Sequence, residues 1–199
     1  MDLTRFFDDV RTTDVSFNQI ENAFKHPKVR YSVCSSESTP FAENTFDLVC
    51  VAQALHWLDF GRFWPEVKRV LKPGGVFAAW GYSWMTVDGE IDLVVQETFL
   101  DVIAPYWAVQ NKLLWNCYRD VKLPFRIIRT PDFEMKMRWD LEQLFAYLHT
   151  WSATKRCIDA RGEGFFRYAQ RRVLSVWGSP SECKDVELDF CCIVGRNVT

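Results

Sequence analysis

The chain has 199 residues, of which 48% are hydrophobic and 16% aromatic; this length and composition predict one globular domain rather than a disordered chain. Its formal net charge of −2, with both signs interspersed, gives no sign of the basic surface that nucleic-acid binding requires. No apolar run reaches the roughly 20 residues of a membrane span, and the opening "MDLTRFFDDV" lacks a secretory-signal pattern. We therefore expect a cytosolic protein without nucleic-acid or membrane partners.

The seven cysteines show no C-x-x-C pair and lie mostly inside apolar runs, which predicts reduced thiols in the core. The three histidines are widely spaced and match no metal-ligand pattern, so we expect no structural metal site.

The first eighty residues alternate short helices with extended segments. Phe46–Val51 is an apolar run apart from Asp47, typical of a strand covered on both faces. Ser16 is placed to cap a helix, and Pro73–Gly75 to stop another. The expected elements are a short helix in 3–10, an extended segment 10–13 ending at Asp14, a helix in 16–26 with Phe17, Ile20 and Phe24 on one face, strands 29–33, 46–51 and 76–80, and a helix starting between Asp59 and Pro65. This alternation predicts βαβ units and a mostly parallel sheet.

Beyond Trp84 the pattern changes to helices and alternating strands. Asp140 and Gln143 form a capping-box pattern ahead of an amphipathic helix in 140–157. The other expected elements are a helix over 91–103, a half-exposed strand 133–139, and a closing strand 186–194 with Val186, Leu188, Phe190, Cys192 and Val194 on one face. With no linker or internal repeat, we expect residues 1–84 and 85–199 to be two parts of one domain.

Three stretches carry a family resemblance in their order: "TTDVSFNQIENA", "SSESTPFAENTFDLVCVAQALHW" and "EVKRVLKPGGVFAAWGY". Together they resemble consecutive motifs of class I S-adenosylmethionine-dependent methyltransferases, most closely the branch that includes trans-aconitate methyltransferase. The resemblance covers nearly the whole chain. It implies a doubly wound, mostly parallel Rossmann-like α/β sheet with S-adenosylmethionine as cofactor.

The resemblance implies cofactor contacts at two turns. Asp14 would accept hydrogen bonds from the ribose hydroxyls, a role that suits a carboxylate at the carboxyl end of a strand; the alternative is a cap for the next helix. Ser35, Ser36 and Glu37 would contact adenine, although Ser35 stands where many relatives carry an acid; an exposed polar turn is the alternative.

A third turn, "AQALHW", would place Gln53 and Ala54 against the cofactor and turn His56 and Trp57 toward the reacting centre. His56 is a candidate general base or substrate-orienting group, and Trp57 a candidate for stacking on the sulfonium cation. A purely structural role for this pair is the alternative.

Aromatic residues Tyr106, Trp107 and Trp151 would line a pocket for a small-molecule substrate, or else belong to the core. Arg119, Arg126 and Arg129 are candidates for bidentate pairing with a carboxylate, or else form a solvated face.

One part of the family pattern is missing. The family's first strand and glycine-rich loop should precede Asp14, but the first glycine is Gly61 and no G-x-G-x-x-G lies upstream. Because that strand is central in the family sheet, the sequence leaves three outcomes open: its neighbours close up, another segment fills the gap, or the chain is a truncated isoform that folds poorly alone.

Two functions from different classes follow. The chain is a methyltransferase acting on a carboxylate or other oxygen of a small molecule, or it is a catalytically inactive methyltransferase-like isoform or binding module. A dinucleotide oxidoreductase fits less well because it needs the same missing loop.

Overall fold

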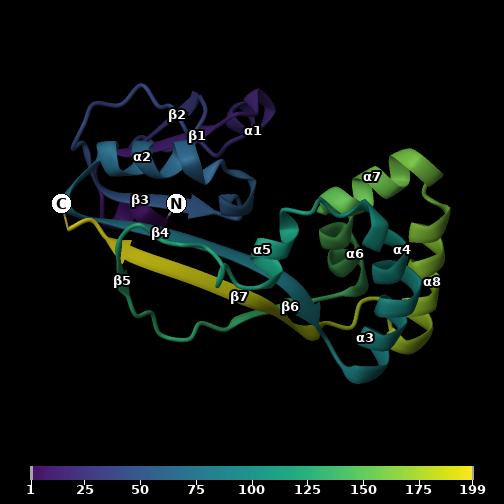
Figure 1. Cartoon of the computed structure of the whole chain (residues 1–199). Helices are drawn as coiled ribbons and strands as arrows, with labels where there is room; N and C mark the ends of the chain where they lie inside the picture. Colours follow the sequence, from purple (N-terminus) through teal and green to yellow (C-terminus); the bar gives the residue numbers. More distant parts are fainter. Residues whose placement is uncertain (1, 199) are drawn as a thin grey trace. The chain divides into compact units, whose positions relative to one another are not determined.

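The computed structural model describes residues 2–198, the side chain of Asp2 excepted, and shows a mixed α/β chain (Figure 1). It divides into two compact units: residues 1–79, 122–129 and 193–199 form the first, and residues 80–121 and 130–192 form the second. The boundaries fall inside β4 (Leu71–Thr86) and β7 (Lys184–Arg196), so both strands contribute residues to each unit. The single-domain partition stays a prediction.

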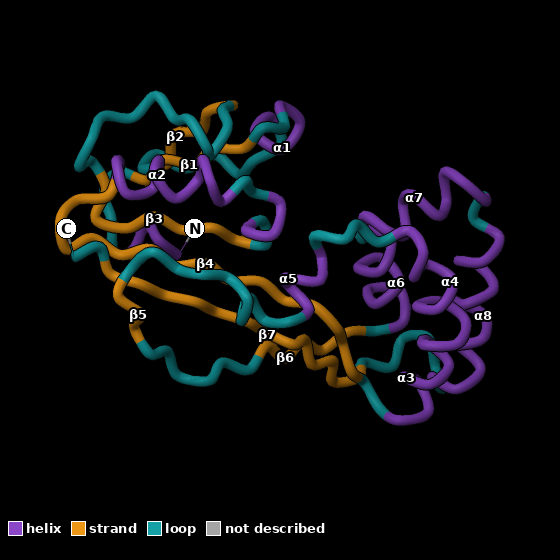
Figure 2. Tube along the Cα trace, viewed as in Figure 1, coloured by secondary structure: helices purple, strands orange, loops and turns teal. Residues whose placement is uncertain are grey.

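The described strands form two sheets (Figure 2). β1 (Val10–Asp14) pairs in parallel with β2 (Val29–Val33). The other sheet has the order β3-β4-β7-β5, with β6 also paired to β7, and both β5 and β6 run antiparallel to β7. The remaining strands are β3 (Phe46–Ala52), β5 (Arg126–Ile128) and β6 (Met135–Trp139). The α/β Rossmann-like fold class is thereby confirmed, and β3 forms an edge of its sheet.

In the first unit, α2 (Phe60–Val70) buries one face, because Phe63, Val67 and Val70 are spaced i, i+4, i+7 and are all buried. The side chain of Asp59 caps the helix by accepting a hydrogen bond from the Gly61 N–H. The other helices of this unit are the 3₁₀ turn η1 (Asp2–Arg5), α1 (Phe17–Glu21) and the 3₁₀ turn η2 (Leu55–Trp57).

Helix α2 stops just before the "KPGG" segment, as predicted, but this segment also belongs to a strand, which was not predicted. The helix ends at Val70, and Pro73–Gly75 lie within β4. There the N–H of Gly74 donates to the Asn197 carbonyl, and the N–H of Asn197 donates to Gly75. Backbone pairing therefore continues through this segment, with Gly74 at a φ of 79° that favours glycine.

The first fifty residues are weakly packed. None of residues 3–50, all of which the structure describes, is buried. Ser16 caps α1 as predicted, but the helix ends at Glu21, and Phe17 and Phe24 are 63% and 64% exposed instead of forming a buried face. In β3 only Val51 is buried, so the prediction of a strand covered on both faces is wrong.

The second unit has a helical core of Ile91, Phe99, Leu144, Trp177 and their neighbours. The predicted helix over 91–103 is present as α3 (Gly89–Val95), a π-helical turn η3 (Gln96–Leu100), and α4 (Asp101–Ile103). Asp140 and Gln143 form the predicted capping box, although the helix breaks at Trp151 and resumes. The other bounds are the 3₁₀ turn η4 (Ala104–Tyr106), α5 (Asn111–Trp115), α6 (Leu141–Thr150), α7 (Ser152–Arg161) and α8 (Gly164–Trp177).

Two cysteines correct the prediction of reduced thiols. Cys117 and Cys191 form a disulfide across 74 positions of sequence. Cys191 is buried within β7, whereas Cys192, which was expected on one face with the buried Val186 and Leu188, is only partly buried. The other five cysteines carry no disulfide.

Within residues 2–198, none of the helices combines the length and apolar character that crossing a membrane requires.

Candidate functional site

A cavity of about 420 Å³ lies between β1 and β3 in the first unit. Residues 11–14 of β1 line one side, and Phe46 with residues 48–52 of β3 line the other. Helix α2 contributes apolar side chains and Glu66. Because Asp14 ends β1 and Ala52 ends β3, the cavity includes the carboxyl ends of both strands, the edge at which open α/β sheets bind ligands.

Asp14 lies at this edge, and one of its two carboxylate oxygens accepts a hydrogen bond within the protein. Its Oδ1 accepts a hydrogen bond from the Ser16 N–H at 2.7 Å, which shapes the turn before α1. Ser16 itself caps α1, so the alternative of Asp14 as the helix cap is replaced by this turn-forming role. Oδ2 makes no hydrogen bond among the described residues, and Asp14 lines the cavity.

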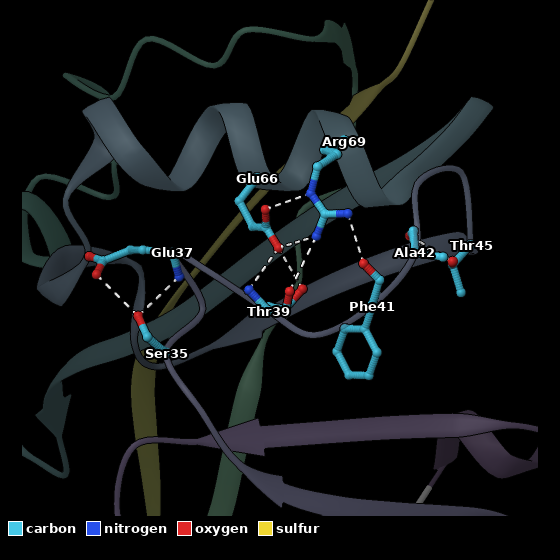
Figure 3. Close-up of polar contacts among 8 residues, drawn as sticks. All are labelled: Ser35, Glu37, Thr39, Phe41, Ala42, Thr45, Glu66 and Arg69. Carbon is cyan, nitrogen blue, oxygen red and sulfur yellow. Dashed lines mark hydrogen bonds and ion pairs between the residues drawn. The ribbon is translucent and has the colours of Figure 1, made fainter.

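The turn after β2 is held by its own acid. The Ser35 hydroxyl donates to Glu37 Oε2 at 3.2 Å, and Glu37 Oε1 accepts from the Asp59 N–H at 2.7 Å (Figure 3 shows the first pair). One carboxylate oxygen of Glu37 therefore closes the turn on Ser35, and the other ties the turn to the N-cap of α2. Of the three residues predicted here, only Ser36 lines the cavity.

The turn after β3 begins with a backbone outlier. Gln53 has a φ of 54°, a left-handed conformation that costs a non-glycine residue about 1 kcal/mol or more and that is common at functional sites. Its neighbour Ala54 lines the cavity.

His56 and Trp57 differ in exposure although they are adjacent. His56 is 4% exposed, Trp57 is 46% exposed, and their rings lie 4.9 Å apart. Burial lowers the pKa of His56 from 6.5 to about 4, because the imidazolium would lose its hydration. At neutral pH His56 is therefore an uncharged imidazole.

A network that the sequence did not reveal fixes the loop between β2 and β3 on α2 (Figure 3). Glu66 accepts hydrogen bonds from the N–H and the hydroxyl of Thr39 and from the Arg69 guanidinium. Arg69 also donates to the carbonyls of Phe41 and Thr39. The hydrogen bond from Arg69, helped by those from Thr39, lowers the pKa of Glu66 to about 2. The signal available in the sequence was the i, i+3 spacing of Glu66 and Arg69 on a helix.

Four of the partly buried indole rings of the second unit lie close together, and we call them the tryptophan cluster: Trp84, Trp107, Trp115 and Trp151. Their ring centroids lie 5.2 to 6.2 Å apart. Trp107 and Trp151, two of the predicted substrate residues, belong to it and also pack against the helical core.

Tyr106, the third predicted substrate residue, is outside the tryptophan cluster. It packs against the helical core, and its carbonyl accepts a hydrogen bond from Arg156. The candidate arginines Arg119, Arg126 and Arg129 are all exposed, as the solvated-face alternative expects.

The structure thus brings Asp14, Ser36 and Ala54 to one cavity. Ser35 and Glu37 hold a turn beside it, and Gln53 shapes the turn after β3. The assignments of His56 and Trp57 to catalysis, and of the aromatic residues to substrate binding, stay predictions.

Comparisons with known proteins agree with this architecture. Residues 1–79 match the family described as "Methyltransferase domain". A solved structure from Anaeromyxobacter dehalogenans, described as a type II methyltransferase, superposes with a TM-score of 0.87 at 33% identity, covering 98% of this chain and 83% of that one. A Dictyostelium discoideum protein named as a methyltransferase is 29% identical over 94% of this chain and 73% of its own length. The human mitochondrial arginine-hydroxylase NDUFAF5 is 39% identical over 49% of this chain and 31% of its own length. The chain belongs to the class I S-adenosylmethionine-dependent methyltransferases.

Proposed function

We propose that the chain binds S-adenosylmethionine at the carboxyl ends of β1 and β3 and transfers its methyl group to a carboxylate or other oxygen of a small molecule. The observation that carries the proposal is the position of Asp14, Ser36 and Ala54, from three separate turns, on one cavity. Family membership supports the reaction type, and the substrate is our inference.

The residues present fit part of the cofactor. Asp14 Oδ2 has no partner among the described residues and is suited to accept a hydrogen bond from a ribose hydroxyl. Glu37 has both carboxylate oxygens engaged, so the adenine contact falls to Ser36 and the backbone of that turn. Gln53 and Ala54 would shape the wall after β3.

Bound there, S-adenosylmethionine supplies an electrophilic methyl group that an incoming oxygen takes in an in-line displacement, for which positioning provides most of the catalysis. The low pKa of His56, about 4, bears on which kind of oxygen accepts the methyl group. A base that weak is poorly matched to an alcohol, since efficient proton transfer needs a pKa near the operating pH. A carboxylate is already anionic at neutral pH, and an uncharged imidazole N–H can orient it.

In this proposal Trp57 excludes water from the methyl group, while Tyr106, Trp107 and Trp151 contact the body of the substrate. Their indole and phenol rings offer large apolar faces with a polar edge, which suits a small organic acid with a carbon skeleton to bury. Cytosolic residence, where small organic acids are abundant, is part of the same proposal.

Isothermal titration calorimetry with S-adenosylmethionine and S-adenosylhomocysteine tests the cofactor site. We expect saturable binding by the wild-type chain. The affinity of Asp14→Asn should be at least about tenfold lower, because losing a charge-assisted hydrogen bond costs about 1.4 kcal/mol or more. Asp185→Asn is the matched control, because Asp185 is an exposed acid of the second unit. Equal affinities of the two variants would contradict the role of Asp14.

A non-catalytic binding module is the second candidate, favoured by the open cavity between β1 and β3 and by the lack of glycine before Gly61. Incubation with labelled S-adenosylmethionine and a panel of organic acids that includes trans-aconitate separates the two. Label transferred to any acid excludes the second candidate, whereas cofactor binding without transfer to any member supports it.

A further inference from the structure

We propose that the Cys117–Cys191 disulfide is a redox-controlled latch on the segment 107–121 of the second unit. Closed, the latch fixes this segment on β7, and with it half of the tryptophan cluster; open, it lets the segment relax. The inference does not depend on the proposed reaction, because it concerns a conformation that can be measured without cofactor or substrate.

The segment 107–121 supplies two of the four rings of the tryptophan cluster. Trp115, which ends α5 two positions before the disulfide, has its ring centroid 5.2 Å from that of Trp84 and 5.6 Å from that of Trp107. The ring of Trp107 lies 5.5 Å from that of Trp151. A shift of this segment would therefore change the surroundings of all four indole rings.

The disulfide is the only covalent tie between this segment and β7. The backbone N–H groups of the segment that donate within the described chain do so to carbonyls of residues 104–118. Buried Leu114 and Tyr118 add side-chain packing. Cys191 Sγ lies 3.9 Å from the Leu114 carbonyl oxygen, but a disulfide sulfur has no hydrogen to donate, and a thiol donates only weakly. Opening the disulfide therefore leaves the segment held mainly by packing.

The backbone at the disulfide is strained. Cys117 and Tyr118 have φ angles of 50° and 55°, so two consecutive residues with a Cβ atom are left-handed. This conformation costs free energy and persists only where the surroundings hold it. Because the disulfide is one of the constraints that hold Cys117, the strain favours relaxation of the segment once the bond opens.

The other cysteines favour a reversible bond over a permanent disulfide framework. Five cysteines carry no disulfide, including the exposed Cys183, whereas small secreted proteins usually pair theirs. Cys192 follows Cys191 and therefore points to the opposite face of the strand. Burial also raises the pKa of the Cys192 thiol, and since the thiolate is the attacking form, Cys192 competes poorly for Cys117 at neutral pH.

Oxidised glutathione, a low-molecular-weight disulfide, is a sufficient oxidant. Cys117 is partly exposed and Cys191 is 4% exposed, so Cys117 reacts first. Its thiolate attacks one sulfur of the glutathione disulfide, whose S–S bond breaks and releases one glutathione thiolate. The Cys191 thiolate then attacks Cys117 Sγ and displaces the second glutathione. Two protein thiols are oxidised to one disulfide, and one glutathione disulfide is reduced to two thiols that take up the two protons; reduced glutathione reverses both steps.

A glutathione titration of the full chain tests this chemistry. The chain is equilibrated at increasing ratios of oxidised to reduced glutathione, free thiols are blocked, and the peptides are identified by mass spectrometry. We expect the linked Cys117–Cys191 peptide to change from mostly absent to mostly present between the ratios of a reducing cytosol and those of an oxidising compartment. A bond that stays closed at every ratio, or one that never forms, would overturn the inference.

Hydrogen exchange at short labelling times tests the movement, because it reports local opening before global unfolding contributes. We expect amides of the segment 107–121 to exchange at least about tenfold faster in the reduced chain, while amides of α8 stay protected in both forms. Cys117→Ser/Cys191→Ser should behave as the reduced chain does under either condition. Cys183→Ser, which changes an exposed unpaired cysteine, is the matched control and should respond as the wild-type chain does.

Near-ultraviolet circular dichroism follows the tryptophan cluster in the same samples. Reduction should change the indole signal, and Trp115→Phe should lose most of this change. Trp64→Phe, whose ring packs against Phe63 and Phe77 in the first unit, is the matched control and should keep it. Equal exchange of the segment 107–121 in the oxidised and reduced chains would overturn the inference. If the double cysteine variant does not fold, the two forms of the wild-type chain decide the matter without it.

Discussion

At the residue scale, the burial of His56 gives stability a pH dependence. Its pKa is about 4 in the folded chain against 6.5 ordinarily, so the unfolded chain binds a proton first as the pH falls. The stabilisation is complete above pH 6.5 and is lost between pH 6.5 and 4, by up to about 3 kcal/mol. Urea unfolding at several pH values should show this loss, and His56→Gln should remove most of it. An unchanged pH profile in His56→Gln would show that another group is responsible.

Glu66 also makes stability depend on pH, but in a lower pH range than His56. Its pKa of about 2 lies below the ordinary 4.5 because Arg69 and Thr39 donate hydrogen bonds to the carboxylate. The stabilisation is present above pH 4.5 and fades as the pH falls toward 2. We expect Glu66→Gln to lower the free energy of unfolding at pH 7 by about 1 to 3 kcal/mol, measured by urea denaturation. Glu134→Gln is the control: its carboxylate is paired but exposed, so water screens the pair and the free energy of unfolding should stay close to that of the wild-type chain.

At the scale of the element, local sequence patterns predict helix caps well, but they predict poorly which strands are buried. The Ser16 cap and the Asp140–Gln143 capping box form as expected, because each depends on side chains within a few residues. The apolar run of β3 was read as a buried strand, but burial depends on which elements lie on either side. "KPGG" predicts the end of α2 correctly, but its place in β4 depends on backbone pairing with Asn197, far along the chain, which no local signal indicates.

The candidate site was predictable where it depends on strand ends. Asp14, Ser36 and Ala54 follow extended segments, and the carboxyl ends of such strands meet at one edge. The Glu66–Thr39 bond spans 27 positions, and no local pattern indicates it. The hydrogen bond from the Asp59 N–H to Glu37 could not be predicted either, because these two residues are also far apart in the sequence.

The uneven burial predicts uneven local stability. The strands β1 and β2 have no buried side chain, whereas Phe99, Leu144 and Trp177 are fully or almost fully buried in the helical core of the second unit. Local opening has a low free energy where few apolar contacts are lost. By hydrogen exchange we expect amides of β1 and β2 to exchange at least about a hundredfold faster than those of α6 and α8, the effect of about 3 kcal/mol. Equal protection would show that β1 and β2 are held by contacts other than side-chain burial.

At the scale of the whole molecule, the Cys117–Cys191 disulfide closes a loop of 74 positions that contains the helices α6, α7 and α8 of the second unit. The sequence did not reveal it, because neither cysteine has a local pairing pattern and the bond depends on the path of the chain between them. A loop of this length restricts the unfolded ensemble, and a native disulfide typically stabilises a protein by about 2 to 5 kcal/mol.

We therefore expect reduction, or the double variant Cys117→Ser/Cys191→Ser, to lower the melting temperature by about 5 to 15 °C for a chain of this size. The matched control is Cys183→Ser, because Cys183 is exposed and carries no disulfide; it should melt as the wild-type chain does. Thiol counting with Ellman's reagent under denaturing conditions should find five free thiols in the oxidised chain. Seven thiols in protein purified from a reducing cytosol would mean that the bond forms only in an oxidising compartment, and the melting difference between the two forms would then measure what the molecule gains there.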